Sequence, residues 1–276
     1  RDAGKEVTTG VQNTIIGALA GDALTTGIGN VAIGYDALST EDAHGLNVAV
    51  GASALSSLNA GANAYNVAVG YQAGLTMTTG VENVLIGGLT GDALTTGDYN
   101  TAVGHKSLSG EDTGNRNTAL GYKTLEVLNY DGNAENTAVG YIAGASITTG
   151  LRNTLVGAFA GDSITTGTDN TAFGRAALAS EDTGNKNTAI GYSALNSLNY
   201  DGDGYNTAMG YNAGVLMTTG TYNTLVGGLA GDSLTTGQYN VAIGYNALAG
   251  EDAHGRNIAI GTNALAVQDV GSDAYN

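Results

Sequence analysis

A five-residue motif, N-x-x-x-G, returns along the whole chain at nearly constant intervals. Its opening Asn stands at positions 13, 30, 47, 66, 83, 100, 117, 136, 153, 170, 187, 206, 223, 240 and 257, and Asn276 stands where the next motif would begin. The intervals of 17, 17, 19 and 17 residues recur as a block, so a 70-residue superrepeat overlies the short repeat. Two nested periods are typical of a solenoid. They predict one repetitive segment, 1–276, with superrepeats at approximately 1–70, 71–140, 141–210 and 211–276.

The length of the short repeat indicates β-structure. Helical repeats need about 33 residues or more, whereas 17 to 19 residues fit one coil of a parallel β-solenoid, so we expect an all-β fold. The 276 residues include 45 Gly, two Phe and no Pro, Cys or Trp, so the core must be aliphatic. The fourth-position Gly and the frequent T-T-G ending supply corners. At a strand spacing of about 4.8 Å, fifteen to sixteen coils predict a rod roughly 70 to 80 Å long.

The strand in each coil predicts a buried and an outward column. Neighbouring strand residues point to opposite faces. The third residue after Asn is always sizeable and apolar, as at Val139, and we expect this column to form the core. The second residue is usually Ala, as at Ala138, and is expected to form an outward stripe. Every fourth coil carries a larger residue in this second column: Ile15, Leu85, Leu155 and Leu225.

An outward apolar stripe predicts an oligomer, because monomers avoid long exposed apolar patches. A symmetric homo-oligomer is the simplest cover. On this interpretation, Ala138→Arg disrupts assembly and leaves the coil formed. The recurring Asn is expected to form a side-chain amide ladder between coils, which explains it better than glycosylation does, because the chain has no N-x-[ST] sequence.

The motifs N-T-A-V-G, N-V-A-I-G and N-T-A-I-G resemble the head repeats of YadA-type trimeric autotransporter adhesins, and similar repeats occur in viral and bacteriophage tail fibres. The resemblance covers essentially the whole chain, although the motif is only about five residues long and the 17/19-residue coil departs from the adhesin pattern. It implies a left-handed β-roll, three chains packed side by side, and service as an adhesive or receptor-reaching fibre. The chain begins and ends inside a repeat, which indicates a segment of a longer fibre.

Acidic residues recur with the superrepeat. Glu-Asp pairs begin at 41, 111, 181 and 251, and single residues recur at Asp22, Asp92, Asp162 and Asp232. We interpret them as solvated loop charges that oppose lateral aggregation. A Ca²⁺ site is the alternative, because neighbouring carboxylates are ligands that Ca²⁺ prefers. Catalysis is not expected from these pairs.

Three further sets of side chains are candidate sites. His44, His105 and His254 lack convergent partners in the sequence and are expected in surface loops. Tyrosines directly follow the motif Gly and offer either an aromatic face for glycans or cover for the seam between coils: Tyr35, Tyr71, Tyr122, Tyr141, Tyr192, Tyr211 and Tyr245. The T-T-G threonines suggest an ice-binding array, but the pair is missing from every third and fourth coil.

The charge balance narrows the partners. Nine basic and 25 acidic residues give a formal charge of −16, which opposes binding to nucleic acid or to an anionic membrane surface. No apolar run is long enough to span a bilayer. We therefore expect no enzyme, no catalytic, cofactor or metal residues, and an extracellular, cell-surface or virion location. The predicted function is a fibre segment that extends a tip toward a host surface, with a host glycan or protein as a further partner. A polymerising extracellular filament is the alternative.

Overall fold

The structure is a computed structural model that describes residues 2–269, 271, 273, 275 and 276. The chain forms two compact units, Arg1–Asn136 and Thr137–Asn276. Every strand has three residues, and the described residues contain no helix. The first unit contains β1 (Thr14–Ile16), β2 (Val31–Ile33), β3 (Val48–Val50), β4 (Val67–Val69), β5 (Val84–Ile86), β6 (Thr101–Val103) and β7 (Thr118–Leu120). The second contains β8 (Thr137–Val139), β9 (Thr154–Val156), β10 (Thr171–Phe173), β11 (Thr188–Ile190), β12 (Thr207–Met209), β13 (Thr224–Val226), β14 (Val241–Ile243) and β15 (Ile258–Ile260).

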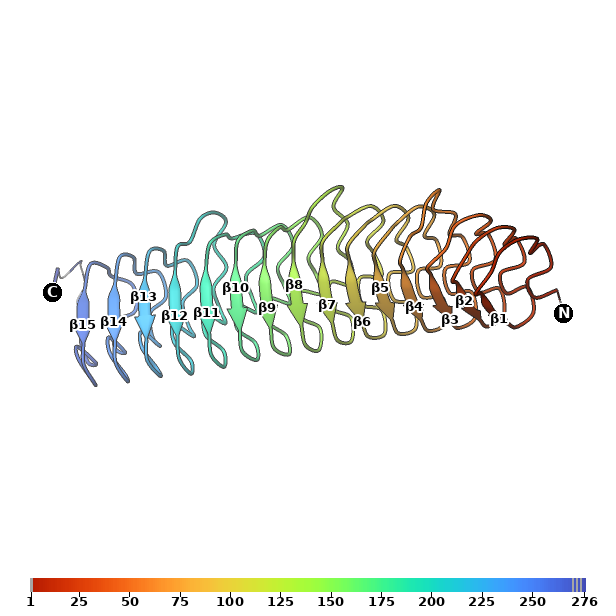
Figure 1. Ribbon diagram of the computed structural model, residues 1–276. Helices are drawn as coiled ribbons and strands as arrows, with labels where there is room; N and C mark the ends of the chain where they lie inside the picture. Colours follow the sequence, from red (N-terminus) through yellow and green to blue (C-terminus); the bar gives the residue numbers. More distant parts are fainter. Residues whose placement is uncertain (1, 270, 272, 274) are drawn as a thin grey trace. The chain divides into compact units, whose positions relative to one another are not determined.

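Within each unit, every strand pairs in parallel with the next strand in the sequence (Figure 1). The register places equivalent motif positions opposite one another: Thr171 pairs with Thr188, and Ala172 pairs with Ala189. One strand per coil, aligned in this way, confirms the predicted parallel β-solenoid with 17- and 19-residue coils.

The two faces of each strand are the reverse of the expectation. Ala138 and the other second-position alanines are buried inside the coil, with Ala138 at 0% exposure. The third-position side chains point outward, and Phe173 is 56% exposed. The predicted outward alanine stripe is therefore wrong. The interior of the coil is narrow, so most strands place the small Ala side chain inside. The larger Ile, Val and Phe side chains of the third position lie outside.

The position eight residues after the motif Asn forms the corner of the coil opposite the strand. The residue at this corner explains why every fourth coil carries a larger residue in the second column. A Cβ atom on Gly91 would lie 2.9 Å from Cδ2 of Leu85, and one on Gly74 would lie 2.9 Å from Cδ1. Gly occupies this corner in the Leu85 coil and the coil before it. Leu occupies it in the other two coils of the superrepeat, as at Leu38 and Leu108, both at positive φ. A large residue on the strand thus fills the space left by missing side chains on the opposite wall.

The motif Gly is required by positive φ and by close approach of the next coil. Gly140 has φ 141°, and a Cβ atom there would lie 2.5 Å from the carbonyl oxygen of Gly157. Gly167, from a T-T-G ending, has no positive φ, but its Cβ atom would lie 2.6 Å from the carbonyl oxygen of Gly184. Any side chain at either corner would push two coils apart.

The recurring Asn side chains connect successive coils, but mainly through the backbone. The Asn170 N–H donates to Oδ1 of Asn153 at 3.1 Å, and the Asn187 N–H donates to Oδ1 of Asn170 at 3.0 Å. Nδ2 of Asn170 donates to the carbonyl oxygen of Gly184 at 2.8 Å. The ladder is at the predicted position, and its principal partners are main-chain groups of the next coil. The Asn170 amide thus satisfies a donor and an acceptor that water cannot reach.

Candidate functional site

The outward side of the strands forms a surface of threonine and apolar side chains in each unit, which we call the sheet face. It consists of the first and third strand residues, so each rung presents Thr, Val or Ile beside an apolar side chain. At a strand spacing of about 4.8 Å and a length of about 10 Å per strand, the eight strands of the second unit span on the order of 400 Å². The apolar third-position residues contribute roughly half of this area. The sheet face is the candidate interaction surface because its apolar column repeats in every strand.

The four glutamates of the acidic pairs are buried, so the expectation that they are solvated is wrong. Glu41, Glu111, Glu181 and Glu251 are each 0% exposed. Oε1 of Glu181 accepts hydrogen bonds from the N–H groups of Gly184 at 2.7 Å and Asp182 at 3.1 Å. The following aspartates are exposed at Asp42 and Asp252 and half-buried at Asp112 and Asp182. Only the Asp of each pair is available to oppose aggregation.

Three of these buried glutamates also hold the longer coil that follows them. Oε2 of Glu181 accepts a hydrogen bond from Tyr200 N–H at 3.3 Å, Oε2 of Glu111 from Tyr130 N–H at 3.4 Å, and Oε2 of Glu41 from Ala60 N–H at 3.3 Å. These donors lie in the 19-residue coils, at the loop that contains the two extra residues. The acidic pair and the longer coil therefore form one structural unit, which explains their shared 70-residue period.

Burial changes the titration of two of these carboxyls. Burial raises the pKa of Glu181 to about 6, although the N–H groups of Gly184, Tyr200 and Asp182 favour the charged form. Burial likewise raises the pKa of Glu111 against its backbone donors. Burial also raises the pKa values of Asp92, Asp162 and Asp232. None of these groups converges with a nucleophile or a second acid in a cleft, so their titration affects stability.

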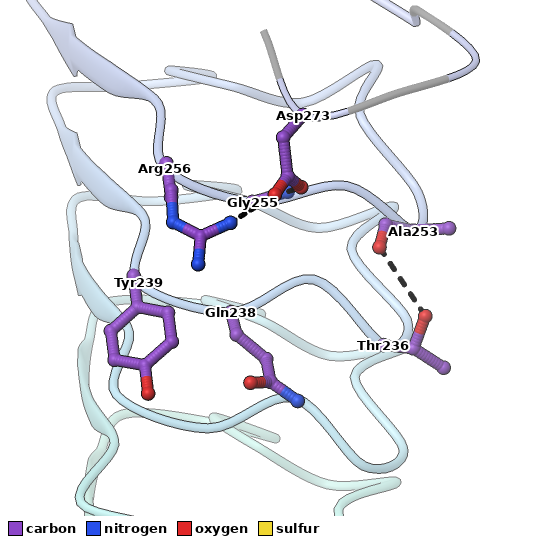
Figure 2. A pocket seen from close by; sticks show the side chains of 7 residues that line it. All are labelled: Thr236, Gln238, Tyr239, Ala253, Gly255, Arg256 and Asp273. Carbon is purple, nitrogen blue, oxygen red and sulfur yellow. Dashed lines mark hydrogen bonds and ion pairs between the residues drawn. The ribbon is translucent and has the colours of Figure 1, made fainter. Parts of the chain in front are cut away.

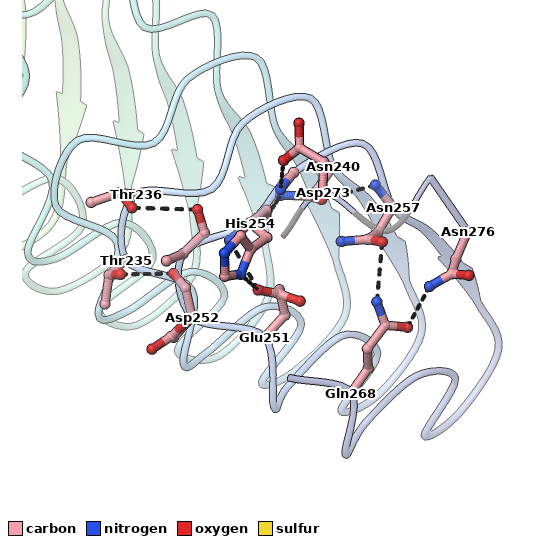
Figure 3. A network of polar contacts seen from close by, with 12 residues as sticks. Thr235, Thr236, Asn240, Glu251, Asp252, His254, Asn257, Gln268, Asp273 and Asn276 are labelled. Carbon is pink, nitrogen blue, oxygen red and sulfur yellow. Dashed lines mark hydrogen bonds and ion pairs between the residues drawn. The ribbon is translucent and has the colours of Figure 1, made fainter. Parts of the chain in front are cut away.

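The histidine loops bring carboxylates and an imidazole together. Glu251, Asp252, His254 and Asp269 each offer a ligand atom within 4.8 Å of the others, as do Glu41, Asp42 and His44. Figure 3 shows Glu251 and His254 facing each other, with Oε1 of Glu251 3.1 Å from Nδ1 of His254. The same oxygen accepts the His254 N–H at 2.9 Å. This oxygen of Glu251 is thus engaged by its own loop, whereas Oε2 of Glu251 has no hydrogen-bond partner among the described residues.

The remaining predicted residues lie on the surface. His44 and His254 are half-buried in their loops, and His105 is exposed and stacks on Tyr122 with ring centroids 5.8 Å apart. The tyrosines that follow the motif Gly are 41% to 58% exposed. Tyr192 and Tyr211 stack on each other, at 5.4 Å. His105 and Arg175 stand in this column between tyrosines, and the Arg175 guanidinium carbon lies 5.6 Å from the Tyr192 ring centroid.

Sequence reasoning missed a second aromatic column, at the residue directly before the motif Asn. Tyr205, Tyr222 and Tyr239 stack in sequence, with centroids 5.3 and 5.0 Å apart and interplanar angles of 16° and 8°. All three have positive φ, between 49° and 59°. The signal was present in the sequence, as three consecutive Tyr-Asn pairs. The position also holds charged residues in other coils, such as Arg152 and Asp169, which form an ion pair at 2.7 Å.

A cavity of about 240 Å³ lies beside the last of these tyrosines. It is lined by Thr236, Gln238, Tyr239, Ala253, Gly255, Arg256 and Asp273. Figure 2 shows the Arg256 guanidinium over Tyr239 and directed toward Asp273, with the Gln238 side chain below. The lining is polar, and its charged groups are paired with each other. It offers a binding recess without acid–base or nucleophilic chemistry.

No protein-family model and no curated protein sequence matches the chain. Among the described residues, none forms a helix with the length and apolarity that a membrane span requires.

Proposed function

We propose that the chain is a structural segment of an extracellular adhesive or tail fibre, and that it works as a side-by-side homo-oligomer, a trimer by the repeat resemblance. Its function is mechanical: it carries a distal tip toward a host or another surface. The proposal assigns no catalytic activity and no cofactor. A cell surface or virion is the proposed location, and a host glycan or protein is the proposed further partner.

The exposed sheet face carries this proposal. Its third column is apolar in every strand. Phe173 is 56% exposed, Ile16 and Ile260 in the first and last strands are 58% and 66% exposed, and most of the other third-position side chains are half-buried. The second unit alone presents on the order of 400 Å² of this surface, and a stable interface buries about 800 Å² per partner. A second copy of the same chain carries the same repeating columns, so strand spacing matches automatically between copies.

The test compares two substitutions that each place an arginine at an outward-facing position. Val139→Arg places a charge on the sheet face, and Leu216→Arg places the same charge at a position that is 52% exposed but lies outside the strands. We expect the unmodified chain to show three times its 27.5 kDa mass by light scattering. Val139→Arg is expected to give the single-chain mass with unchanged circular dichroism, and Leu216→Arg to keep the assembled mass.

A single-chain mass for the unmodified protein would contradict the oligomer. A mass that rises with concentration, with particles of variable length in electron micrographs, would instead favour the polymerising filament.

The ice-binding alternative gains little support from the T-T-G threonines. Oγ1 of Thr165 donates to the carbonyl oxygen of Asp182 at 3.1 Å, and Oγ1 of Thr95 donates to that of Asp112 at 2.9 Å. These hydroxyls therefore bind the next coil. The strand threonines of β8–β13 do point outward, but Phe173 and Met209 protrude beside them. Thermal hysteresis in a nanolitre osmometer would revive this alternative.

A further inference from the structure

The tyrosine column, defined as Tyr205, Tyr222 and Tyr239, has cations at both ends. Nζ of Lys186 lies 5.0 Å from the Tyr205 ring centroid, and the Arg256 guanidinium carbon lies 5.7 Å from that of Tyr239. With the three rings between them, the five side chains extend over four coil steps, about 19 Å at the spacing of neighbouring strands. The column is therefore a continuous surface on one unit.

Stacking decides which part of each ring a ligand can reach. The near-parallel rings, 5.0 and 5.3 Å apart, cover one another's faces, and Lys186 and Arg256 cover the two outer faces. Yet Tyr205, Tyr222 and Tyr239 remain 45%, 46% and 50% exposed. The exposed parts are therefore ring edges. Sugars stack on ring faces, so this column does not suit them. Ring edges carry partial positive charge and attract the negative face of another aromatic ring.

The local charge around the tyrosine column is nearly balanced, so the site does not require a charged ligand. Lys186 pairs with Asp203 at 2.6 Å, and Arg256 pairs with Asp273. Both cations are thus locally neutralised, and the chain as a whole carries −16. A neutral ligand meets no repulsion here. The polar cavity at the Tyr239 end provides room for a substituent on one end of the ligand.

We propose that the tyrosine column binds flat, extended aromatic molecules, which lie along the column with one face against the three ring edges. Each ring edge contributes one edge-to-face contact, so affinity grows with the number of consecutive tyrosines. Isolated tyrosines at the same motif position, such as Tyr99 between Glu82 and Arg116, provide only one contact and do not form such a site.

The test uses Nile red, a flat neutral aromatic dye, and the full chain. Tyr222→Gln removes the central ring. The backbone accepts Gln at this position, because Gln12 occupies the equivalent place at φ 62° and Tyr222 has φ 58°. Tyr99→Gln is the matched control. We expect fluorescence titration to show at least fivefold weaker binding for Tyr222→Gln, an intermediate loss for Tyr205→Gln, and less than a twofold change for Tyr99→Gln.

Tyr222→Phe separates the ring edge from the hydroxyl, and we expect it to bind within twofold of the unmodified chain. Equal titrations for Tyr222→Gln and the unmodified chain would overturn the proposal. A loss for Tyr222→Phe as large as for Tyr222→Gln would also overturn it, because the hydroxyl would then be responsible. Circular dichroism of each variant confirms that the coils are formed.

Discussion

Oε2 of Glu181 accepts a hydrogen bond from the N–H of Tyr200, 3.3 Å away and 19 residues later in the sequence. Oε1 of the same carboxyl holds the N–H of Gly184 at 2.7 Å. One buried side chain therefore closes its own loop and positions the loop of the next coil. Its carboxyl is one group through which pH acts on the stability of the second unit.

The raised pKa of Glu181 predicts a loss of stability as pH rises. Burial raises this pKa to about 6 from an ordinary value of 4.5, so the folded chain binds more protons than the unfolded chain between these values. The contribution is complete below about pH 4.5 and is lost as pH rises through 6. Its size is about 2 kcal/mol. Urea unfolding at pH 4.5 and pH 7 measures it as the difference between the unmodified chain and Glu181→Gln, which lacks this dependence. Parallel pH profiles for the two proteins would contradict the assignment.

The fit between Leu85 and Gly91 predicts a compensating pair. Leu85→Ala should reduce the free energy of unfolding by about 2–5 kcal/mol, because a cavity opens in the coil. Gly91→Leu alone should also destabilise the coil, since a Cβ atom there already lies 2.9 Å from Cδ2 of Leu85.

The double variant reproduces the Ala-and-Leu combination of neighbouring coils and should recover part of the loss. A double-variant cycle in urea measures the coupling. Additive losses would show that the two residues do not share one space.

The Asn ladder predicts a large effect of a single-atom exchange. Nδ2 of Asn206 donates to the carbonyl oxygen of Gly220 at 2.8 Å. Asn206→Asp replaces this donor with an oxygen facing another oxygen and buries a charge, so we expect a loss of about 3 kcal/mol in the free energy of unfolding. Asn263→Asp, at an exposed site, is the control and should change the same quantity by less than about 0.5 kcal/mol.

The burial of Ala138 reverses the consequence first expected of Ala138→Arg. Its side chain is 0% exposed, so arginine there enters the coil interior and should destabilise the second unit by more than about 4 kcal/mol. Thermal unfolding followed by circular dichroism measures this. If Ala138→Arg melts at the temperature of the unmodified chain, the inward direction of this column is contradicted.

Much of the fold follows from the sequence. The interval between Asn residues determines one strand per coil, and the corner glycines follow from their constant position. The sequence does not determine which strand residues point into the coil. Ala and Val both suit a β-strand, and their alternation alone does not say which face is inside. The burial of Glu181 could not be predicted either, because a Glu-Asp pair in a loop normally indicates side chains that are exposed to solvent. Its partner Tyr200 lies in the next coil, and only the three-dimensional arrangement brings the two together. The stacking of the tyrosines likewise depends on the three-dimensional arrangement of neighbouring coils.

The Asn ladder has a consequence for how a repetitive chain finds its correct alignment. Most coils offer the same contact between the Asn backbone N–H and the Asn side chain of the coil before, as between Asn170 and Asn153 or Asn240 and Asn223, so this contact alone does not distinguish one coil from its neighbour. The contacts from Glu111 to Tyr130 and from Glu181 to Tyr200 join a 17-residue coil to the 19-residue coil after it, and they recur only with the 70-residue superrepeat. A coil paired with the wrong neighbour would leave its buried Glu without this partner, which costs about 1–3 kcal/mol and disfavours misalignment.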